Sequence, residues 1–222
     1  MQYPDGTRAI DAVGFSIGVG ENVALIGANG AGKTSLLLAL VGVLQLAGGQ
    51  IRIDDLSLNK ESLREIRSRI GIVFQNPDDQ LFMPSIFDDI AFGPRSYGCD
   101  EAETTERVET TLSRLGIAHL KTRSALKLSG GEKRLAAIAA VLAMKPELLL
   151  FDEPTAFLDP RARRNLVTTL LDLPQSKLIA THDLAFAEAL CSRVLLLQNG
   201  KIITDGTIEL LRDAAVLETA GL

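Results

Sequence analysis

Gly27-Ala28-Asn29-Gly30-Ala31-Gly32-Lys33-Thr34 is the stretch that decides the fold, because it matches the phosphate-loop pattern G-x-x-x-x-G-K-[ST]. A short apolar strand precedes it and a helical pattern from Lys33 to about Leu44 follows. Glycines let the backbone curl so that its N–H groups point at phosphate oxygens, and the helix adds its positive dipole end. We expect Lys33 to reach the β- and γ-phosphates of a nucleotide, and the Thr34 hydroxyl to bind Mg²⁺. The alternative is a glycine-rich turn without a ligand.

Outward from this loop, the chain alternates between strand and helix patterns, which is typical of a mainly parallel α/β sheet. Apolar strands are predicted at 70–74, 148–151, 177–181 and 194–197, and helices at 63–69, 161–173 and 184–190. The middle, roughly residues 79–145, reads as mainly helical, with Ser85 and Ser129 as candidate caps. Asn199-Gly200 predicts a hairpin turn after the last of these strands. We interpret residues 1–222 as one domain with an inserted helical subdomain.

The composition of the chain disfavours nucleic-acid binding, a disulfide framework, a zinc site and a membrane-spanning helix. The net charge of −5 gives no sign of a basic nucleic-acid surface, so no nucleic-acid partner is expected. Cys99 and Cys191 lie far apart in sequence without His or Cys neighbours at ligand spacing, which disfavours a disulfide framework or a zinc site. The apolar runs are shorter than the ~20 residues that a membrane-spanning helix needs, and we expect no signal peptide.

Two acidic residues, Asp152 and Glu153, follow the apolar strand 148–151 directly. Ligands of α/β sheets bind at the carboxyl ends of strands, so these side chains are expected beside the phosphate loop. Asp152 is predicted to hold Mg²⁺, and Glu153 to polarise the attacking water as a general base. Taken alone, such a pair is often only a solvated loop.

A second candidate anion site is Leu128-Ser129-Gly130-Gly131-Glu132-Lys133, a serine and two glycines at a helix start. An ordinary serine cap is the alternative. The segment lies in the helical middle of the chain, away from the helix of the phosphate loop. A second anion site is best explained if it covers the nucleotide of another molecule, which predicts a pair of ATPase chains.

In this order of elements the chain resembles the ABC ATPases, the nucleotide-binding subunits of ATP-binding cassette transporters. The motifs that carry the resemblance are the phosphate loop, Gln75, LSGGE at 128–132, LLLFDE at 148–153, AFLD at 156–159 and THD at 181–183. The resemblance implies a P-loop NTPase core with a mainly parallel sheet, an N-terminal antiparallel β subdomain and an inserted helical subdomain. It also implies ATP hydrolysis with Mg²⁺ and two subunits, identical or mixed, that sandwich two ATPs.

The resemblance assigns roles to single residues. Gln75 would contact Mg²⁺ and the attacking water, His182 the γ-phosphate, and Asp159 the dimer interface. Tyr3 would stack on adenine, although a plain surface tyrosine remains the alternative. The full nucleotide-binding set is Tyr3, Gly27, Ala28, Asn29, Gly30, Ala31, Gly32, Lys33, Thr34, Ser35, Ser129, Gly130, Gly131 and Asp159. Two departures from the family pattern are Glu132, where Gln is commoner, and Phe157, where small residues are frequent.

The segment Phe74-Gln75-Asn76-Pro77-Asp78-Asp79-Gln80-Leu81-Phe82 looks like the ATPases of energy-coupling-factor importers and of related cobalt and nickel uptake systems. Tyr3-Pro4-Asp5-Gly6-Thr7 resembles the opening of the same group, although NPDDQ alone could be a polar turn. The resemblance implies a peripheral protein on the cytoplasmic face of the membrane, energising uptake of a transition-metal ion or a vitamin. An integral membrane subunit would dock near Gln75 and the helical subdomain.

Apolar contacts for that subunit could come from Phe82, Met83, Ile86 and Phe87, or these residues could pack inside the lobe. Two other function classes are alternatives. A non-transport ABC ATPase of DNA repair, translation or cluster assembly usually carries long inserts or tandem cassettes. A P-loop kinase or GTPase lacks the LSGGE segment and the late histidine.

Overall fold

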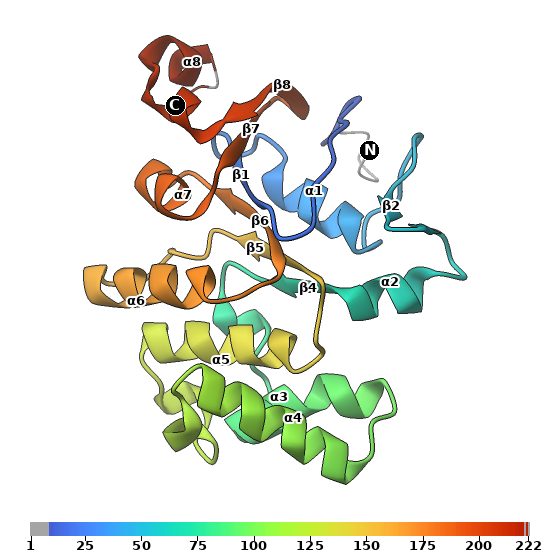
Figure 1. The fold of residues 1–222 in the computed structure, drawn as a ribbon, viewed down its shortest axis with the longest axis vertical. Helices are drawn as coiled ribbons and strands as arrows, with labels where there is room; N and C mark the ends of the chain where they lie inside the picture. The colour runs from blue at the N-terminus through green and yellow to red at the C-terminus, as the bar shows by residue number, and fades with distance from the viewer. Residues whose placement is uncertain (1–8, 220, 222) are drawn as a thin grey trace.

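The structure is a computed structural model that describes residues 9–219 and 221, so the expectations for Tyr3 and residues 3–7 lie outside the described residues. A six-stranded sheet forms its centre, in the order β4-β5-β6-β1-β7-β8 (Figure 1). Neighbours are parallel from β4 to β7, and β8 pairs antiparallel with β7. The strands are β1 (Asn22–Ile26), β4 (Ile70–Val73), β5 (Leu148–Asp152), β6 (Ser176–Thr181), β7 (Arg193–Gln198) and β8 (Lys201–Thr207).

Helices cover both faces of the sheet, as the continuous apolar runs of its strands require. One face packs against α1 (Lys33–Leu40) and α2 (Leu63–Arg69), and the other against α6 (Pro160–Leu171) and α7 (Leu184–Leu190). A 3₁₀ turn η4 (Ile208–Arg212) and a short helix α8 (Ala214–Thr219) follow β8 on the α7 side. The mainly parallel α/β core predicted from the sequence is confirmed.

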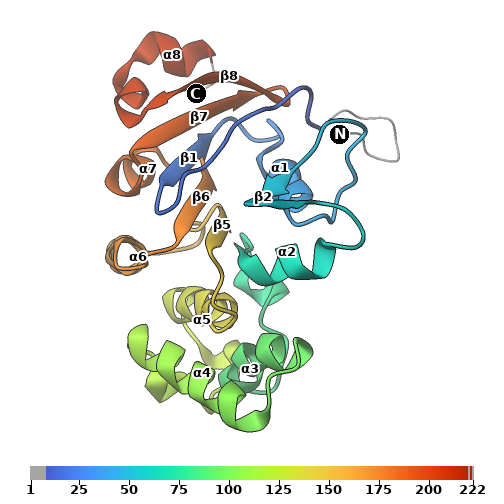
Figure 2. The ribbon, with the colours of Figure 1, turned by 45° about the vertical axis from the view of Figure 1, so that its right-hand side comes forward.

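A helical block with its own core lies at the end of the molecule opposite β8 (Figure 2). It contains η1 (Pro77–Asp79), α3 (Ile86–Ser96), α4 (Glu101–Arg114), η2 (Ala118–Leu120), η3 (Ala125–Lys127) and α5 (Gly130–Leu142). Ser85 and Ser129 cap α3 and α5 through their side-chain oxygens, as their positions predict. The second face of α5 packs under β4 and β5, so this helix belongs to both cores.

One detail differs from the sequence-based expectation. The helix that begins at Lys33 ends at Leu40 instead of about Leu44, because Gly42 takes a left-handed φ of 67° that stops it. The antiparallel part is a small sheet of two short strands, β2 (Arg52–Ile53) and β3 (Leu56–Ser57). The predicted hairpin is present, with Asn199 and Gly200 both at positive φ.

Among the described residues, no helix combines the length and the apolar character that crossing a bilayer would require.

Candidate nucleotide site

The loop between β1 and α1 forms a curled backbone cradle. A Cβ on Gly27 would overlap the carbonyl oxygen of Leu197, and Gly30 and Gly32 have φ values of 82° and 107°. The first turn of α1 contains no acidic residue, and no side chain of the described residues caps the helix at Gly32. The amide groups at this helix start are thus left for an anion. Asn29 is exposed at the tip of the loop, and Ser35 is buried on the first turn of α1.

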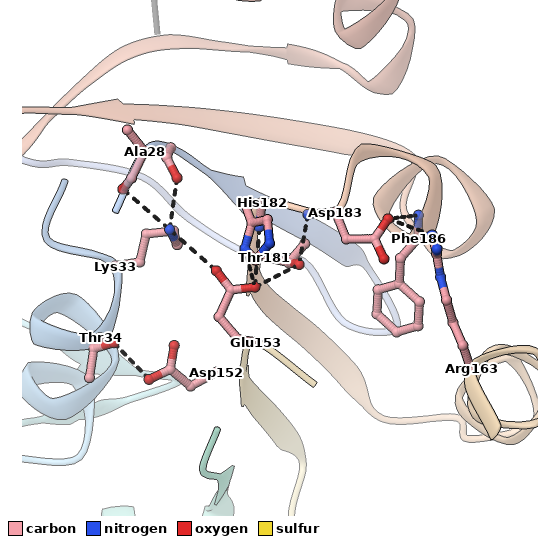
Figure 3. A network of polar contacts seen from close by, with 11 residues as sticks. Ala28, Lys33, Thr34, Asp152, Glu153, Arg163, Thr181, His182, Asp183 and Phe186 are labelled. Atoms are coloured by element: carbon pink, nitrogen blue, oxygen red, sulfur yellow. Dashed lines mark hydrogen bonds and ion pairs between the residues drawn. The ribbon is translucent and has the colours of Figure 1, made fainter. Parts of the chain in front are cut away.

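Lys33 lies across this cradle with only 7% of its surface exposed. Its Nζ donates to the carbonyl oxygen of Gly27 at 2.7 Å and to that of Ala28 at 3.4 Å. The same nitrogen lies 3.4 Å from Glu153 Oε1 (Figure 3). The ammonium group is therefore held above the loop by acceptors that a phosphate oxygen could replace.

Asp152 ends β5 beside the start of α1, and its Oδ2 accepts a hydrogen bond from Thr34 Oγ1 at 2.7 Å. Its other oxygen, Oδ1, is buried and accepts no hydrogen bond from residues 9–219 or 221. Burial raises the pKa of Asp152 above its ordinary value, although the bond from Thr34 acts in the opposite direction. A hydroxyl and a carboxylate with a free oxygen are the hard oxygen donors that Mg²⁺ prefers beside nucleotide phosphates, so these residues fit the ion.

Glu153 is buried and gathers three groups from the end of β6. Its Oε2 accepts from Thr181 Oγ1 at 3.0 Å and from the His182 amide at 3.2 Å, and lies 2.9 Å from His182 Nδ1. The His182 side chain is 62% exposed, whereas the Glu153 side chain beside it is only 8% exposed. Glu153 also has a positive φ of 43°, an uncommon conformation for a non-glycine residue. The structure thus brings Lys33, Glu153 and His182 together at the carboxyl edge of the sheet.

The LSGGE segment forms a separate site at the start of α5. Ser129 and Glu132 make a reciprocal capping box: the Glu132 amide donates to Ser129 Oγ, and Glu132 Oε2 accepts from the Ser129 amide at 2.8 Å. Ser129 Oγ also donates to the same carboxylate at 2.7 Å. Ser129, Gly131 and Asp159 line one hollow between α5 and α6, where Asp159 caps α6. No described residue of the phosphate loop lines this hollow.

Gln75 follows β4 by two residues, next to the strand that carries Asp152 and Glu153. Its side chain is exposed, and its main-chain carbonyl oxygen accepts a hydrogen bond from Arg134.

Phe157 is 82% exposed, with a φ of 64°, on the loop between Glu153 and Asp159. The sequence motifs include Thr181 but predict no contact between it and Glu153, and they do not include Arg134. The signal for Arg134 was a charged residue on the same face of α5 as the buried Ala137 and Ile138.

Comparison with known proteins identifies the family. A sequence model described as "ABC transporter" matches residues 10–156, which is more than half of the chain. A Geobacter sulfurreducens protein with a provisional ABC transporter ATP-binding name is 49% identical over 92% of this chain and 82% of its own length. The energy-coupling factor transporter ATP-binding protein EcfA of Methanothermobacter thermautotrophicus is 43% identical over 99% of this chain and 73% of its own length.

A solved structure supports the same assignment. CbiO1 of Clostridium perfringens, described as part of the ABC transporter complex CbiONQ, superposes with a TM-score of 0.87 at 35% identity, covering 98% of this chain and 89% of that one. The family match, these relatives and the phosphate-loop geometry agree. The chain therefore belongs to the ABC transporter family, as one of its ATP-binding and ATP-hydrolysing subunits.

Proposed function

We propose that this chain is the motor subunit of an importer that takes up a transition-metal ion or a vitamin. The ATP-hydrolysis part of this proposal rests on one group of side chains at the edge of the sheet. Lys33, Glu153 and His182 form this group, and Thr34 and Asp152 lie beside it. This arrangement places a phosphate-binding cation next to a buried general base. The import function is supported by the similarity to EcfA and to CbiO1, whose names refer to an energy-coupling factor transporter and to the CbiONQ complex.

The residues of this site would divide the reaction among them. Backbone amides of the curled loop and the Lys33 ammonium group bind the β- and γ-phosphates, and Lys33 exchanges the Gly27 carbonyl for a phosphate oxygen. Thr34, Asp152 and Gln75 would hold Mg²⁺, which neutralises phosphate charge when it is bound. Glu153, oriented by Thr181 and His182, accepts the proton of the attacking water. His182 is exposed beside Glu153 and would contact the γ-phosphate.

The second anion site supports a pair of chains. Ser129 and Gly130 are exposed at the start of α5, and the hollow that Ser129 and Gly131 line shares no described residue with the phosphate loop. We infer that this helix start covers the nucleotide of a second ATPase chain, with Asp159 at the same interface. ATP would then join the two chains and hydrolysis would separate them.

An apolar surface on the helical block suggests where a membrane subunit docks. Of the four candidates, Phe82 is 63% exposed, whereas Ile86 is fully buried and Met83 and Phe87 are partly buried. Phe92 is also exposed and packs edge-to-face against Phe82 with ring centroids 5.3 Å apart. This aromatic pair lies near the Gln75 loop in sequence and would receive a short helix of the membrane subunit. Such docking would hold the chain at the cytoplasmic face of the membrane.

Uptake measurements in the producing organism test the import function. Deletion of the gene is expected to reduce uptake of one labelled cargo among cobalt, nickel, biotin and other vitamins. The wild-type gene should restore that uptake, whereas Glu153→Gln should not. If uptake of every cargo stays normal while the purified chain hydrolyses ATP, the importer role is wrong and a non-transport ABC ATPase becomes the better explanation.

A further inference from the structure

A buried arginine on α5 has no part in the reaction described above. Arg134 is 1% exposed, and its two terminal nitrogens donate to the carbonyl oxygens of Phe74 at 2.6 Å and Gln75 at 2.7 Å. Its Nε is buried and has no hydrogen-bond partner in the part of the chain that the structure describes. Among the described residues, Arg134 has no carboxylate within ion-pair distance, and burial lowers its pKa to about 10.

The stability of the fold does not explain a buried guanidinium group at this position. Removing a guanidinium from water costs several kcal/mol, in order of magnitude, and neutral carbonyl acceptors offset only part of that cost. An apolar residue would fill the same space within the core at lower cost. The two carbonyls that Arg134 binds belong to the end of β4, where the chain leaves the sheet toward the exposed Gln75 side chain.

The Gln80 side chain also connects the segment after β4 to α5. Gln80 Nε2 donates to the Ala137 carbonyl on α5 at 2.8 Å, and its Oε1 accepts from the Phe74 amide at 3.4 Å. Lys133 Nζ on α5 pairs with Asp78 Oδ1 at 2.6 Å, on the outer side of the loop. Both main-chain polar groups of Phe74, and the carbonyl of Gln75, are therefore fixed directly or indirectly to α5.

This loop lies beside the reacting groups. Val73 of β4 is paired with Phe151 of β5, and the next residues of β5 and its loop are Asp152 and Glu153. The charge of Arg134 acts on Asp152 as well, lowering the pKa that burial of this carboxyl raises. A shift of Gln75 by a fraction of an ångström would change its distance to the attacking water.

We propose that Arg134 is a positioning residue for Gln75, and that Gln80 assists it by tying Phe74 to α5. The inference rests on the proposed role of Gln75 in hydrolysis. Since Ser129 begins the helix that carries Arg134, the same contact also makes the Gln75 backbone follow any movement of the LSGGE segment.

Steady-state kinetics of the purified full chain, together with ATP binding by calorimetry, test the proposal. Arg134→Met should lower kcat for ATP by about 10- to 100-fold, the size expected when a reacting group is misplaced by about 1 Å or less. The KM and the Kd for ATP should stay within about twofold, because Arg134 donates its hydrogen bonds to Phe74 and Gln75 and not to the phosphate loop. Arg134→Lys, which can reach one carbonyl, should restore part of kcat.

A double-mutant cycle separates positioning from general damage. In a Gln75→Ala background, Arg134→Met should cost little further activity, because its effect passes through Gln75. Arg107→Met is the matched control, since Arg107 also donates to a main-chain carbonyl, that of Ala143 at 3.3 Å, but at the end of α5 opposite Ser129. That variant should keep wild-type kcat.

Gln80→Met gives a second route if Arg134→Met does not fold, because Gln80 is only partly buried. Gln80→Met should lower kcat without changing the Kd for ATP, and only when Gln75 is present. Two results would overturn the proposal. One is a kcat loss from Arg134→Met or Gln80→Met that is as large in the Gln75→Ala background as in the wild type, and the other is an unchanged kcat in both variants. A wild-type chain without ATP turnover, or Gln75→Ala with full activity, would instead contradict the proposed function on which the inference rests.

Discussion

Two glycine-rich helix starts in this molecule are built differently. At α1, Gly32 is the cap residue, no side chain occupies the helix end, and no acid lies in the first turn. At α5, Ser129 and Glu132 satisfy each other's amide groups, and a carboxylate lies in the first turn. Lys33 is buried at the first helix start, whereas Ser129 and Gly130 are exposed at the second.

We infer that this difference separates a site that binds an anion within one chain from a site that needs a second chain. The open amides and the buried lysine of α1 can hold a triphosphate within a single chain. The helix start of α5 is already capped by its own residues, so an anion must compete with the Glu132 carboxylate. We therefore expect the first site to determine nucleotide affinity, and the second to act only when two chains meet.

The largest effect is expected at the general base beside the first site. Glu153→Gln should lower kcat by about 10²- to 10⁴-fold, the usual contribution of a positioned base. ATP affinity should be retained or rise slightly, because the variant frees Lys33 from its carboxylate neighbour. Single-turnover and calorimetric measurements check both parts. Glu147→Gln, at the opposite end of the same strand, is the control, and wild-type turnover by Glu153→Gln would refute the assigned role.

Lys33→Ala should weaken ATP binding by about 100-fold, since a hydrogen bond to a charged group contributes about 1.5–3 kcal/mol. Lys133→Ala, at the other helix start, should change the Kd by no more than about twofold. Calorimetry on both purified variants gives the comparison directly. Equal affinities for the two variants would remove the distinction drawn between the sites.

Local patterns predicted most of this architecture, and the parts they missed are contacts between distant segments. The strand, the glycine loop and the helix around Lys33 follow from a motif, and Ser85 and Ser129 follow from cap positions. The predicted end of α1 was wrong, although Gly42 was a local signal that the helix stops there. The pairing of Lys33 with Glu153, and that of Arg134 with Gln75, depend on which strands become neighbours in the sheet, which no single segment specifies.

Ser129→Ala should reduce the free energy of unfolding by about 1 kcal/mol through loss of the α5 cap. ATP affinity of the single chain should not change, because Ser129 belongs to the second helix start. Chemical denaturation and calorimetry measure the two quantities, with Ser129→Thr as the variant that keeps a capping hydroxyl. A loss of affinity comparable to that of Lys33→Ala would mean that both helix starts serve one nucleotide within a chain.

The smallest effect is expected for Glu132→Gln, which removes a negative charge from the second helix start. The Ser129 bonds lower the pKa of Glu132, so the carboxylate is ionised at neutral pH and repels an incoming phosphate. Charges at helix ends contribute about 0.3–1 kcal/mol, so half-maximal activity should need about two- to fivefold less protein. The concentration dependence of specific ATPase activity measures this. An unchanged or higher requirement would show that α5 does not meet an anion.

The central claim is that ATP held by one chain is covered by the α5 start of another. Sedimentation of the Glu153→Gln variant, with and without ATP and Mg²⁺, tests it most directly. We predict a single chain without nucleotide, a two-chain species at saturating ATP, and loss of that species when Ser129→Arg is added. A single chain that sediments unchanged while calorimetry shows its ATP site filled would contradict the account.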